Sequence, residues 1–253
     1  MTSRRARAAV SSNLSRVLGK APGSAAVQAA TRESFDAYAC YWFETFRLRV
    51  MSPEQVEERM SFEGRENLDA ALRAGKGVVV AVPHMGNWDA AGRWLALNGY
   101  RAVSVAEALR PRRLLDLFVR HREELGLEII VLEKGARVTA CLAERLAQNW
   151  LVGLVADRDL SGRGIEAEMF GGIRRLPAGP ASLSVETGAP LLAAGLYSEA
   201  GRWRCVVGAP LEIERTGDPR EDTATLTRLM AAEFERAIAR HPADWHMFRR
   251  AWP

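Results

Sequence analysis

The sequence of 253 residues has few cysteines and no long uninterrupted apolar run. Its three cysteines, Cys40, Cys141 and Cys205, are odd in number and far apart, so we expect no disulfide framework and a reducing compartment. No apolar run approaches the ~18 residues of a membrane-spanning helix, so we expect no bilayer crossing. The length suits one well-packed domain with an appendage.

Several motifs of familiar enzyme classes are also missing. Without G-x-S-x-G the sequence lacks the nucleophile elbow of serine hydrolases. Neither a phosphate-binding G-x-x-x-x-G-K-[ST] loop nor a G-x-G-x-x-G turn after a strand occurs. A metal site at His241, Asp244 and His246 is conceivable, but Pro242 interrupts the helix that would align them, and we expect no metal.

Lysine is scarce, and acidic residues are absent from the first 32 positions. Only three of the 35 basic residues are lysines. Arginine suits phosphate and carboxylate, although a GC-rich genome produces the same bias. An acid-free leader is typical of a disordered tail, the commonest outcome, but also of a nucleic-acid arm or a patch that binds anionic lipid. Its basic residues are Arg4, Arg5, Arg7, Arg16, Lys20 and Arg32.

The chain then shows two different periodicities. Over residues 24–50, aromatic residues recur at helical spacing and predict one long helix, whose stripe favours core packing over a lipid-facing role. Ser52 and Pro53 predict the start of a second helix. The stripe consists of Phe35, Tyr38, Trp42 and Phe46.

From residue 61, short apolar runs alternate with helical patterns, which predicts an α/β fold with a central, mostly parallel sheet flanked by helices. We therefore expect a helical segment over 1–60, which we assign to membrane docking, and an α/β domain over 61–253. Expected strands cover 77–82, 101–106, 127–132, 150–156, 190–197 and 203–208. Expected helices cover 88–98, 111–125, 137–149, 179–188 and 222–240. Residues 157–180 are Gly-rich and too long for a routine connection.

Candidate catalytic side chains follow two of the expected strands. Sites in such sheets lie beyond the carboxyl ends of the strands, where His84 and Asp157 are found. Asp89, in the first turn of the next helix, could fold back onto one imidazole nitrogen of His84 and leave the other as a general base. Alternatively, Asp89 only favours the helix N-terminus and His84 is a turn residue.

The stretch "VPHMGNWDAAGRW" resembles the H-x4-D/E block of bacterial lipid A-type lauroyl/myristoyl acyltransferases, and more closely that of actinobacterial phosphatidylinositol mannoside acyltransferases. Collinear similarity extends from about Asn13 to Pro253. Those relatives begin with a further apolar helical stretch, so we expect either a recorded start that lies too late or a chain that lacks part of the membrane-docking helix. The other similar segments are "YWFETFRL", "VADRDLSGRGIEAEMFGGIRRLPAGPASLSVETGAPLL" and "HPADWHMFRRAW".

The resemblance implies a fold like that of glycerol-3-phosphate acyltransferases and a peripheral position on the cytoplasmic face of the plasma membrane. It implies transfer of a long acyl chain from acyl-CoA, a substrate and not a cofactor, to a mannose hydroxyl of phosphatidylinositol mannosides. His84 is then the general base, Asp89 its orienting acid and Asp157 a second acid. Implied substrate-binding residues are Asn87, Glu107, Arg110, Arg122, Arg158, Arg163, Arg174 and Arg175.

Within that set, we expect Arg158, Arg163, Arg174 and Arg175 to meet lipid phosphates and the CoA diphosphate. The backbone amides of Gly86 and Asn87, or Arg158, are candidate donors to the oxyanion. Two alternatives stay open. One is a lipid A-type or other glycolipid acyltransferase that uses acyl-CoA or acyl-carrier protein. The other is a non-enzymatic, basic-armed membrane-binding protein; no nucleic-acid-binding motif occurs.

Overall fold

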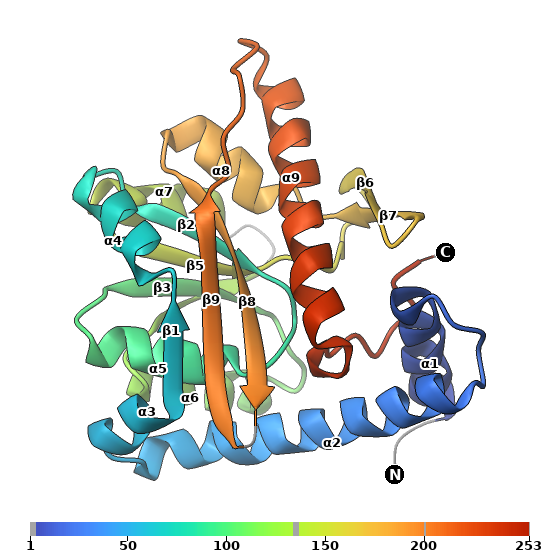
Figure 1. The fold of residues 1–253 in the computed structure, drawn as a ribbon. Helices are drawn as coiled ribbons and strands as arrows, with labels where there is room; N and C mark the ends of the chain where they lie inside the picture. The colour runs from blue at the N-terminus through green and yellow to red at the C-terminus, as the bar shows by residue number, and fades with distance from the viewer. Residues whose placement is uncertain (1–3, 134–136, 200, 253) are drawn as a thin grey trace.

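The computed structural model describes residues 4–133, 137–199 and 201–252 (Figure 1). Within them, seven strands form one sheet in the order β1-β9-β8-β2-β5-β3-β4. Its neighbours pair in parallel except β8 with β9, so the predicted α/β fold with a mostly parallel sheet is confirmed. The strands are β1 Met60–Glu63, β2 Val78–Val82, β3 Ala102–Glu107, β4 Glu128–Leu132, β5 Leu151–Val155, β8 Leu191–Glu199 and β9 Arg202–Pro210.

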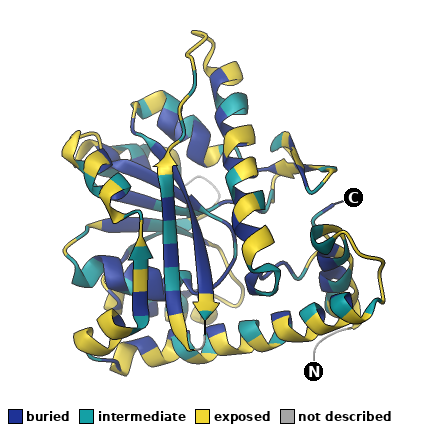
Figure 2. Ribbon diagram, viewed as in Figure 1, coloured by how far each residue is buried: buried dark blue, intermediate teal, exposed yellow. Residues whose placement is uncertain are grey.

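Helices flank this sheet, and the central strands carry the core. Val78, Val79 and Ala81 of β2 are fully buried, as a strand covered on both faces requires. Figure 2 shows the central strands largely buried and the helices exposed along their outer sides. The helices after β1 are α4 Arg65–Arg73, α5 Trp88–Leu97, α6 Arg112–Glu124, α7 Val138–Ala147, α8 Gly179–Thr187, α9 Pro219–Arg240 and the 3₁₀ turn η2 Pro242–Asp244.

Helix α2, Ala25–Arg47, lies across the carboxyl ends of the parallel strands (Figure 1). The side chain of Ser24 caps its first turn. After the 3₁₀ turn η1 Leu48–Val50, α3 spans Pro53–Arg59 and starts with Ser52 as its N-cap and Pro53 in its first turn, as predicted. Gln55 adds the return bond of a capping box, which was not predicted. The predicted boundary at residue 60 stays a prediction, and β1 begins there.

Helix α1, Arg4–Leu18, lies in the acid-free leader. The disordered-tail alternative is therefore wrong for these residues, because the helix buries Val10 and Leu14 against its neighbours. The buried side chain of Asn13 holds the C-terminal segment, which Figure 1 shows beside α1. Within the described ranges, no helix combines the length and apolarity needed to cross a membrane.

The Gly-rich stretch contains a structure that the sequence analysis did not predict. Strands β6, Ile165–Met169, and β7, Gly172–Leu176, form an antiparallel hairpin. Its two-residue turn, Phe170–Gly171, has positive φ at both positions, as type I′ turns require. Strand β1 and helix α4 were also not predicted.

Candidate active site

The loop between β2 and α5 presents His84 at the carboxyl end of the sheet. A tight turn is possible because Gly86 has φ +56°, and a Cβ there would lie 2.4 Å from the carbonyl oxygen of Leu196. Asn87 then caps α5, since its Oδ1 accepts the amide of Ala90 at 2.9 Å. The predicted strand–turn–helix arrangement is therefore confirmed.

The imidazole of His84 pairs with Asp157, which follows β5. Nδ1 of His84 bonds to Oδ1 of Asp157, and the indole Nε1 of Trp245 donates to Oδ2 at 2.7 Å. Asp157 is fully buried, whereas 15% of the His84 side chain is exposed. Burial alone would raise the pKa of Asp157, but His84, Arg174 and the Trp245 hydrogen bond outweigh it and hold that pKa below its usual range.

The other imidazole nitrogen faces a guanidinium. Nη2 of Arg158 lies 2.6 Å from Nε2 of His84, and the same atom lies 3.7 Å from Glu107. A guanidinium only donates, so Nε2 carries a lone pair and the hydrogen is on Nδ1, bound to Asp157. This tautomer leaves Nε2 able to take a proton.

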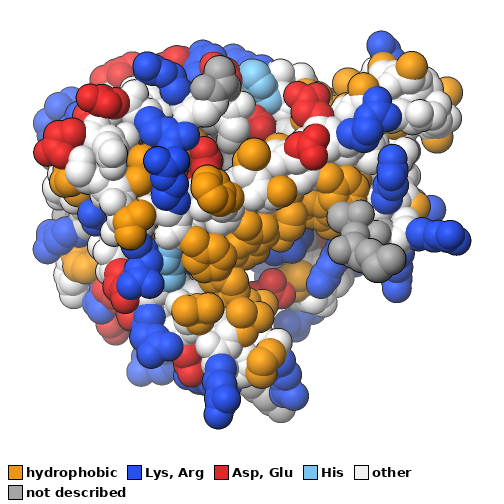
Figure 3. Space-filling model, turned by 90° about the horizontal axis from the view of Figure 1, so that it is seen from below, with side chains coloured by type: hydrophobic (Ala, Val, Ile, Leu, Met, Phe, Trp, Pro, Cys, Tyr) orange, Lys and Arg blue, Asp and Glu red, His pale blue; other side chains and the backbone are white. Residues whose placement is uncertain are grey.

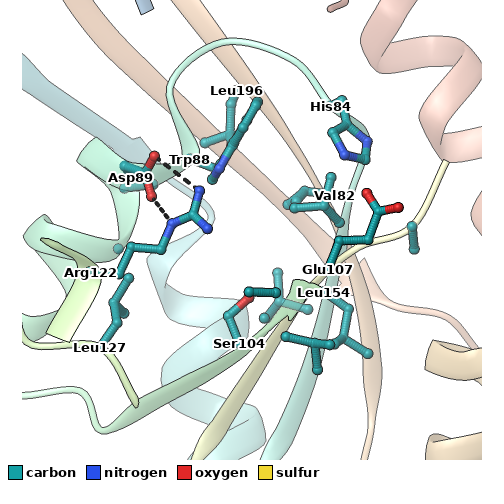
Figure 4. A pocket seen from close by; sticks show the side chains of 18 of the residues that line it. Val82, His84, Trp88, Asp89, Ser104, Glu107, Arg122, Leu127, Leu154 and Leu196 are labelled. Carbon is teal, nitrogen blue, oxygen red and sulfur yellow. Dashed lines mark hydrogen bonds and ion pairs between the residues drawn. The ribbon is translucent and has the colours of Figure 1, made fainter. Parts of the chain in front are cut away.

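Asp89 does not make the contact predicted for it. Its Oδ1 accepts from Nε of Arg122 at 2.7 Å, and its Oδ2 accepts from the hydroxyl of Tyr41 at 2.8 Å. The first turn of α5 directs Asp89 toward α6 and α2, and Figure 4 shows the Trp88 ring between it and His84. The predicted direct contact between Asp89 and His84 is therefore wrong; Asp157 is the partner.

Asp89 and Arg122 form a largely buried ion pair. Burial would lower the pKa of Arg122, yet the adjacent Asp89 carboxylate raises it above its ordinary value. Burial and the same carboxylate both raise the pKa of Tyr41. Arg122 is therefore a fixed cation and Tyr41 a neutral donor, and both bond to the side chain of Asp89.

A cavity of about 890 Å³ opens beside these groups. Its walls are mainly aliphatic, and His84, Asp89, Glu107, Arg122 and Arg158 are among its few ionisable lining groups (Figure 4). Seen from below, a band of hydrophobic side chains crosses a hollowed face of the molecule (Figure 3). An apolar cavity with converging polar groups at one end is the usual form of a site for an apolar ligand.

Comparison with known proteins agrees with this geometry. The whole chain, residues 1–253, matches the family described as bacterial lipid A biosynthesis acyltransferase. The chain belongs to that family of acyltransferases.

Three curated relatives are each named phosphatidylinositol mannoside acyltransferase. Two, from Mycobacterium tuberculosis strains CDC 1551 / Oshkosh and ATCC 25618 / H37Rv, are 41% identical over 243 residues, which is 95% of this chain and 75% of theirs. The third, from Mycolicibacterium smegmatis strain ATCC 700084 / mc(2)155, is 40% identical over 241 residues, 95% of this chain and 77% of its own. The resemblance predicted from the motifs is confirmed.

Arg174 of this acyltransferase does not occupy the phosphate-binding position predicted for it. Only 5% of Arg174 is exposed, and its guanidinium donates to the backbone carbonyl of Asp157. Burial lowers its pKa, and Asp157 opposes that effect. Arg174 therefore supports the acid and cannot meet a substrate phosphate, which corrects the prediction.

The other predicted arginines lie on the surface. Arg110 is exposed before α6, and Arg163 is exposed in the loop after Asp157. Arg175 donates to the carbonyl of Gly162 at 2.7 Å and to Glu166 at 3.1 Å. The structure thus gathers Glu107, Arg122 and Arg158 at the cavity and leaves these three outside its lining.

Two side chains of the site, Tyr41 and Trp245, were not predicted. Tyr41 precedes Trp42 of the aromatic stripe in the sequence. Its hydroxyl group is the sequence feature that could have indicated a polar role. Trp245 lies in the "HPADWHMFRRAW" segment, which carries part of the family resemblance, but the sequence analysis gave this tryptophan no role of its own. In the described part of the chain, no group of three His, Cys, Asp or Glu residues could hold a metal ion.

Proposed function

We propose that this protein transfers a long acyl chain from acyl-CoA to a mannose hydroxyl of a phosphatidylinositol mannoside, with His84 as the general base. The observation that carries the proposal is the His84–Asp157 pair at the end of a large, mainly aliphatic cavity. The relatives' printed name supports the acceptor.

The reaction needs a base because a sugar hydroxyl is a poor nucleophile near neutral pH. Nε2 of His84 takes the hydroxyl proton while the oxygen attacks the thioester carbonyl. Asp157 stabilises the imidazolium that forms and keeps its orientation. The tetrahedral intermediate then collapses, the C–S bond breaks, and the CoA thiolate leaves and takes up the proton. No covalent enzyme intermediate is required.

The developing oxyanion needs a donor. The amide of Gly86 is already used, because it donates to the carbonyl of Asp244 at 3.0 Å, so the earlier expectation for that amide is corrected. Arg158 is the better candidate: its guanidinium occupies the space at Nε2 of His84 where the acceptor hydroxyl would enter. We expect Arg158 to shift onto the oxyanion when substrate binds. The exposed Arg110, Arg163 and Arg175 are then left to meet phosphate groups.

The acyl chain is proposed to lie in the cavity. Its walls include Val80, Val105, Ile129 and Leu154, and such aliphatic side chains would replace water around a hydrocarbon chain. This placement brings the thioester carbonyl to the end where His84 lies.

We also propose that α2 and α6 dock on the anionic cytoplasmic face of the plasma membrane. Phe43 is 69% exposed and Val50 is 82% exposed, and exposed apolar residues that gather in one patch mark a surface that binds a partner or lipid. Figure 3 shows Lys and Arg side chains beside the hydrophobic band. Further exposed apolar residues there are Phe46, Leu114 and Leu117, and exposed arginines are Arg47, Arg49, Arg113 and Arg120.

The test is acyl transfer with purified protein, acyl-CoA and mannosylated phosphatidylinositol in anionic vesicles, followed by CoA release and by mass spectrometry of the lipid. We expect His84→Ala to lose at least about 100-fold in kcat, the usual range for removal of a general base. His241→Ala is the matched control, since His241 pairs with Glu199 outside the cavity lining.

The alternatives give different results in the same assay. If product forms only when acyl-carrier protein carries the acyl chain, the donor is acyl-carrier protein and not CoA. If a different glycolipid is acylated, the proposed acceptor is wrong. Vesicle binding with no transfer to any acceptor by the wild-type protein would contradict the enzyme proposal and support a non-enzymatic membrane-binding protein.

A further inference from the structure

The C-terminal residues 241–252, here called the strap, pass directly over the turn that carries the base. The amide of His246 donates to the carbonyl of His84 at 2.7 Å, and the amide of Gly86 donates to the carbonyl of Asp244 at 3.0 Å. Nε2 of His246 lies 3.1 Å from the carbonyl oxygen of Gly86. The strap therefore fixes the backbone on which the imidazole is mounted.

Trp245 extends this support to the acid. Its indole Nε1 donates to Oδ2 of Asp157 at 2.7 Å, and only 2% of Trp245 is exposed. The other carboxylate oxygen bonds to Nδ1 of His84. A carboxylate held through both oxygens cannot turn about its Cβ–Cγ bond, so its Oδ1 stays directed at the imidazole.

A second tryptophan in the same cluster lacks this contact. The guanidinium of Arg174 lies 5.6 Å from the ring centre of Trp245 and 5.4 Å from that of Trp252. The indole of Trp252 donates instead to the carbonyl of Gly172 at 3.3 Å. Only one of the two indole N–H groups therefore reaches Asp157.

The strap is also held on the far side of Trp245. The Nδ2 of Asn13 in α1 donates to the carbonyls of Met247 and Arg249, at 3.0 and 2.8 Å. Its Oδ1 accepts the amide of Ala251 at 3.0 Å. With the turn on one side and α1 on the other, the indole of Trp245 has a fixed place.

We propose that Trp245 is a positioning residue for acyl transfer, whose indole N–H holds the Asp157 carboxylate in the orientation that aligns His84. The role rests on the proposed function to the extent that His84 is the base. Trp245 acts through Asp157 and does not touch the substrate.

The sharpest test removes the N–H and keeps the shape. Replacement of Trp245 by β-(3-benzothienyl)alanine puts sulfur in place of the N–H. Loss of one hydrogen bond to a charged group should lower kcat about 10-fold with KM unchanged. The imidazole Nδ1 proton resonance of His84, assigned with His84→Gln, should also move. Trp245→Phe, which also lacks the N–H donor, should likewise lower kcat and move the resonance.

The matched control is the same replacement at Trp252, which should leave both kcat and the resonance at their wild-type values. An unchanged resonance and kcat after replacement at Trp245, or equal changes from both tryptophans, would overturn the proposal. The resonance needs no substrate. If the wild-type protein transfers no acyl group, the proposed function fails, and the resonance alone still decides whether Trp245 positions Asp157.

Discussion

Two buried aspartates, Asp89 and Asp157, lie beside the same cavity and bind different kinds of partner. Asp157 bonds to the imidazole of His84, to an indole and, through its backbone carbonyl, to an arginine. Asp89 bonds to the cation Arg122 and to Tyr41. One carboxylate therefore bonds to the side chain that we propose as the general base, and the other pairs with a permanent cation.

The comparison teaches that distance along the chain does not select the partner of a base. Asp89 follows His84 by five positions but belongs to a helix that directs it elsewhere. Asp157 is remote in sequence, yet β2 and β5 are parallel neighbours and Val82 pairs with Val155. Residues just after two such strands meet at the same sheet edge, which places Asp157 beside His84.

The largest effect is expected from Asp157→Asn. An amide cannot fix the imidazole tautomer as the carboxylate does, and the comparable change in a serine protease triad lowers kcat about 10⁴-fold. We expect a loss of about 10³-fold in kcat here. Steady-state CoA release measures it, with circular dichroism to confirm folding. Activity of Asp157→Asn within a few-fold of wild type would contradict the role assigned to Asp157 in this comparison.

Asp89→Asn should instead act mainly on stability. It leaves the Arg122 guanidinium largely buried without its counter-charge, and we expect a loss of about 3 kcal/mol in the free energy of unfolding. Urea unfolding measures this. The double variant Asp89→Asn/Arg122→Gln should recover most of the loss, and failure of that recovery would show that the ion pair is not what the change disrupts.

Tyr41→Phe removes one hydrogen bond from Asp89 and leaves its ion pair with Arg122. A bond to a charged group contributes about 1.5–3 kcal/mol, so we expect the free energy of unfolding to fall by about 2 kcal/mol. The vesicle-free protein suffices for this measurement. An unchanged stability would mean that Arg122 alone satisfies the carboxylate.

The smallest effect is expected from the titration of Asp244, a buried residue of the strap. Burial raises the pKa of Asp244 to about 6, above an unfolded value of about 4. Between about pH 4 and pH 6 the folded state binds more protons than the unfolded state. The stabilisation that the raised pKa of Asp244 provides is therefore full below about pH 4 and lost as pH rises through about 6. Asp244→Asn lacks this dependence.

From pH 4 to 7, the stability of wild type relative to Asp244→Asn should therefore fall by about 1–2 kcal/mol. Paired urea titrations at several pH values measure the difference. Titrating groups that both proteins share, such as His246, affect the two proteins alike and cancel from it. A difference that stays constant or rises with pH would contradict this assignment for Asp244.

Much of this structure follows from periodicity and turn chemistry. The alternation after residue 61 predicts the parallel sheet, and Ser52 with Pro53 predicts the start of α3. The hairpin β6–β7 was not predicted because its strands are short and flanked by glycines, although Ile165, Ala167 and Met169 alternate with polar residues.

The site was predictable in position and not in its contacts. The strand ends locate His84 and Asp157, because all parallel strands finish at one edge. The partner of Asp89 depends on α2 and α6, and the burial of Arg174 depends on Trp245 and Trp252. These contacts join segments far apart in the chain, and local spacing carries no information about them.

The most direct test of the central claim, that Asp157 and not Asp89 orients the base, is the imidazole Nδ1 proton resonance of His84 near neutral pH. A proton held between Nδ1 and a buried carboxylate exchanges slowly enough with water to be observed. The resonance should be present in the wild-type protein, persist in Asp89→Asn and disappear in Asp157→Asn. Loss of the resonance in Asp89→Asn, with retention in Asp157→Asn, would contradict the account.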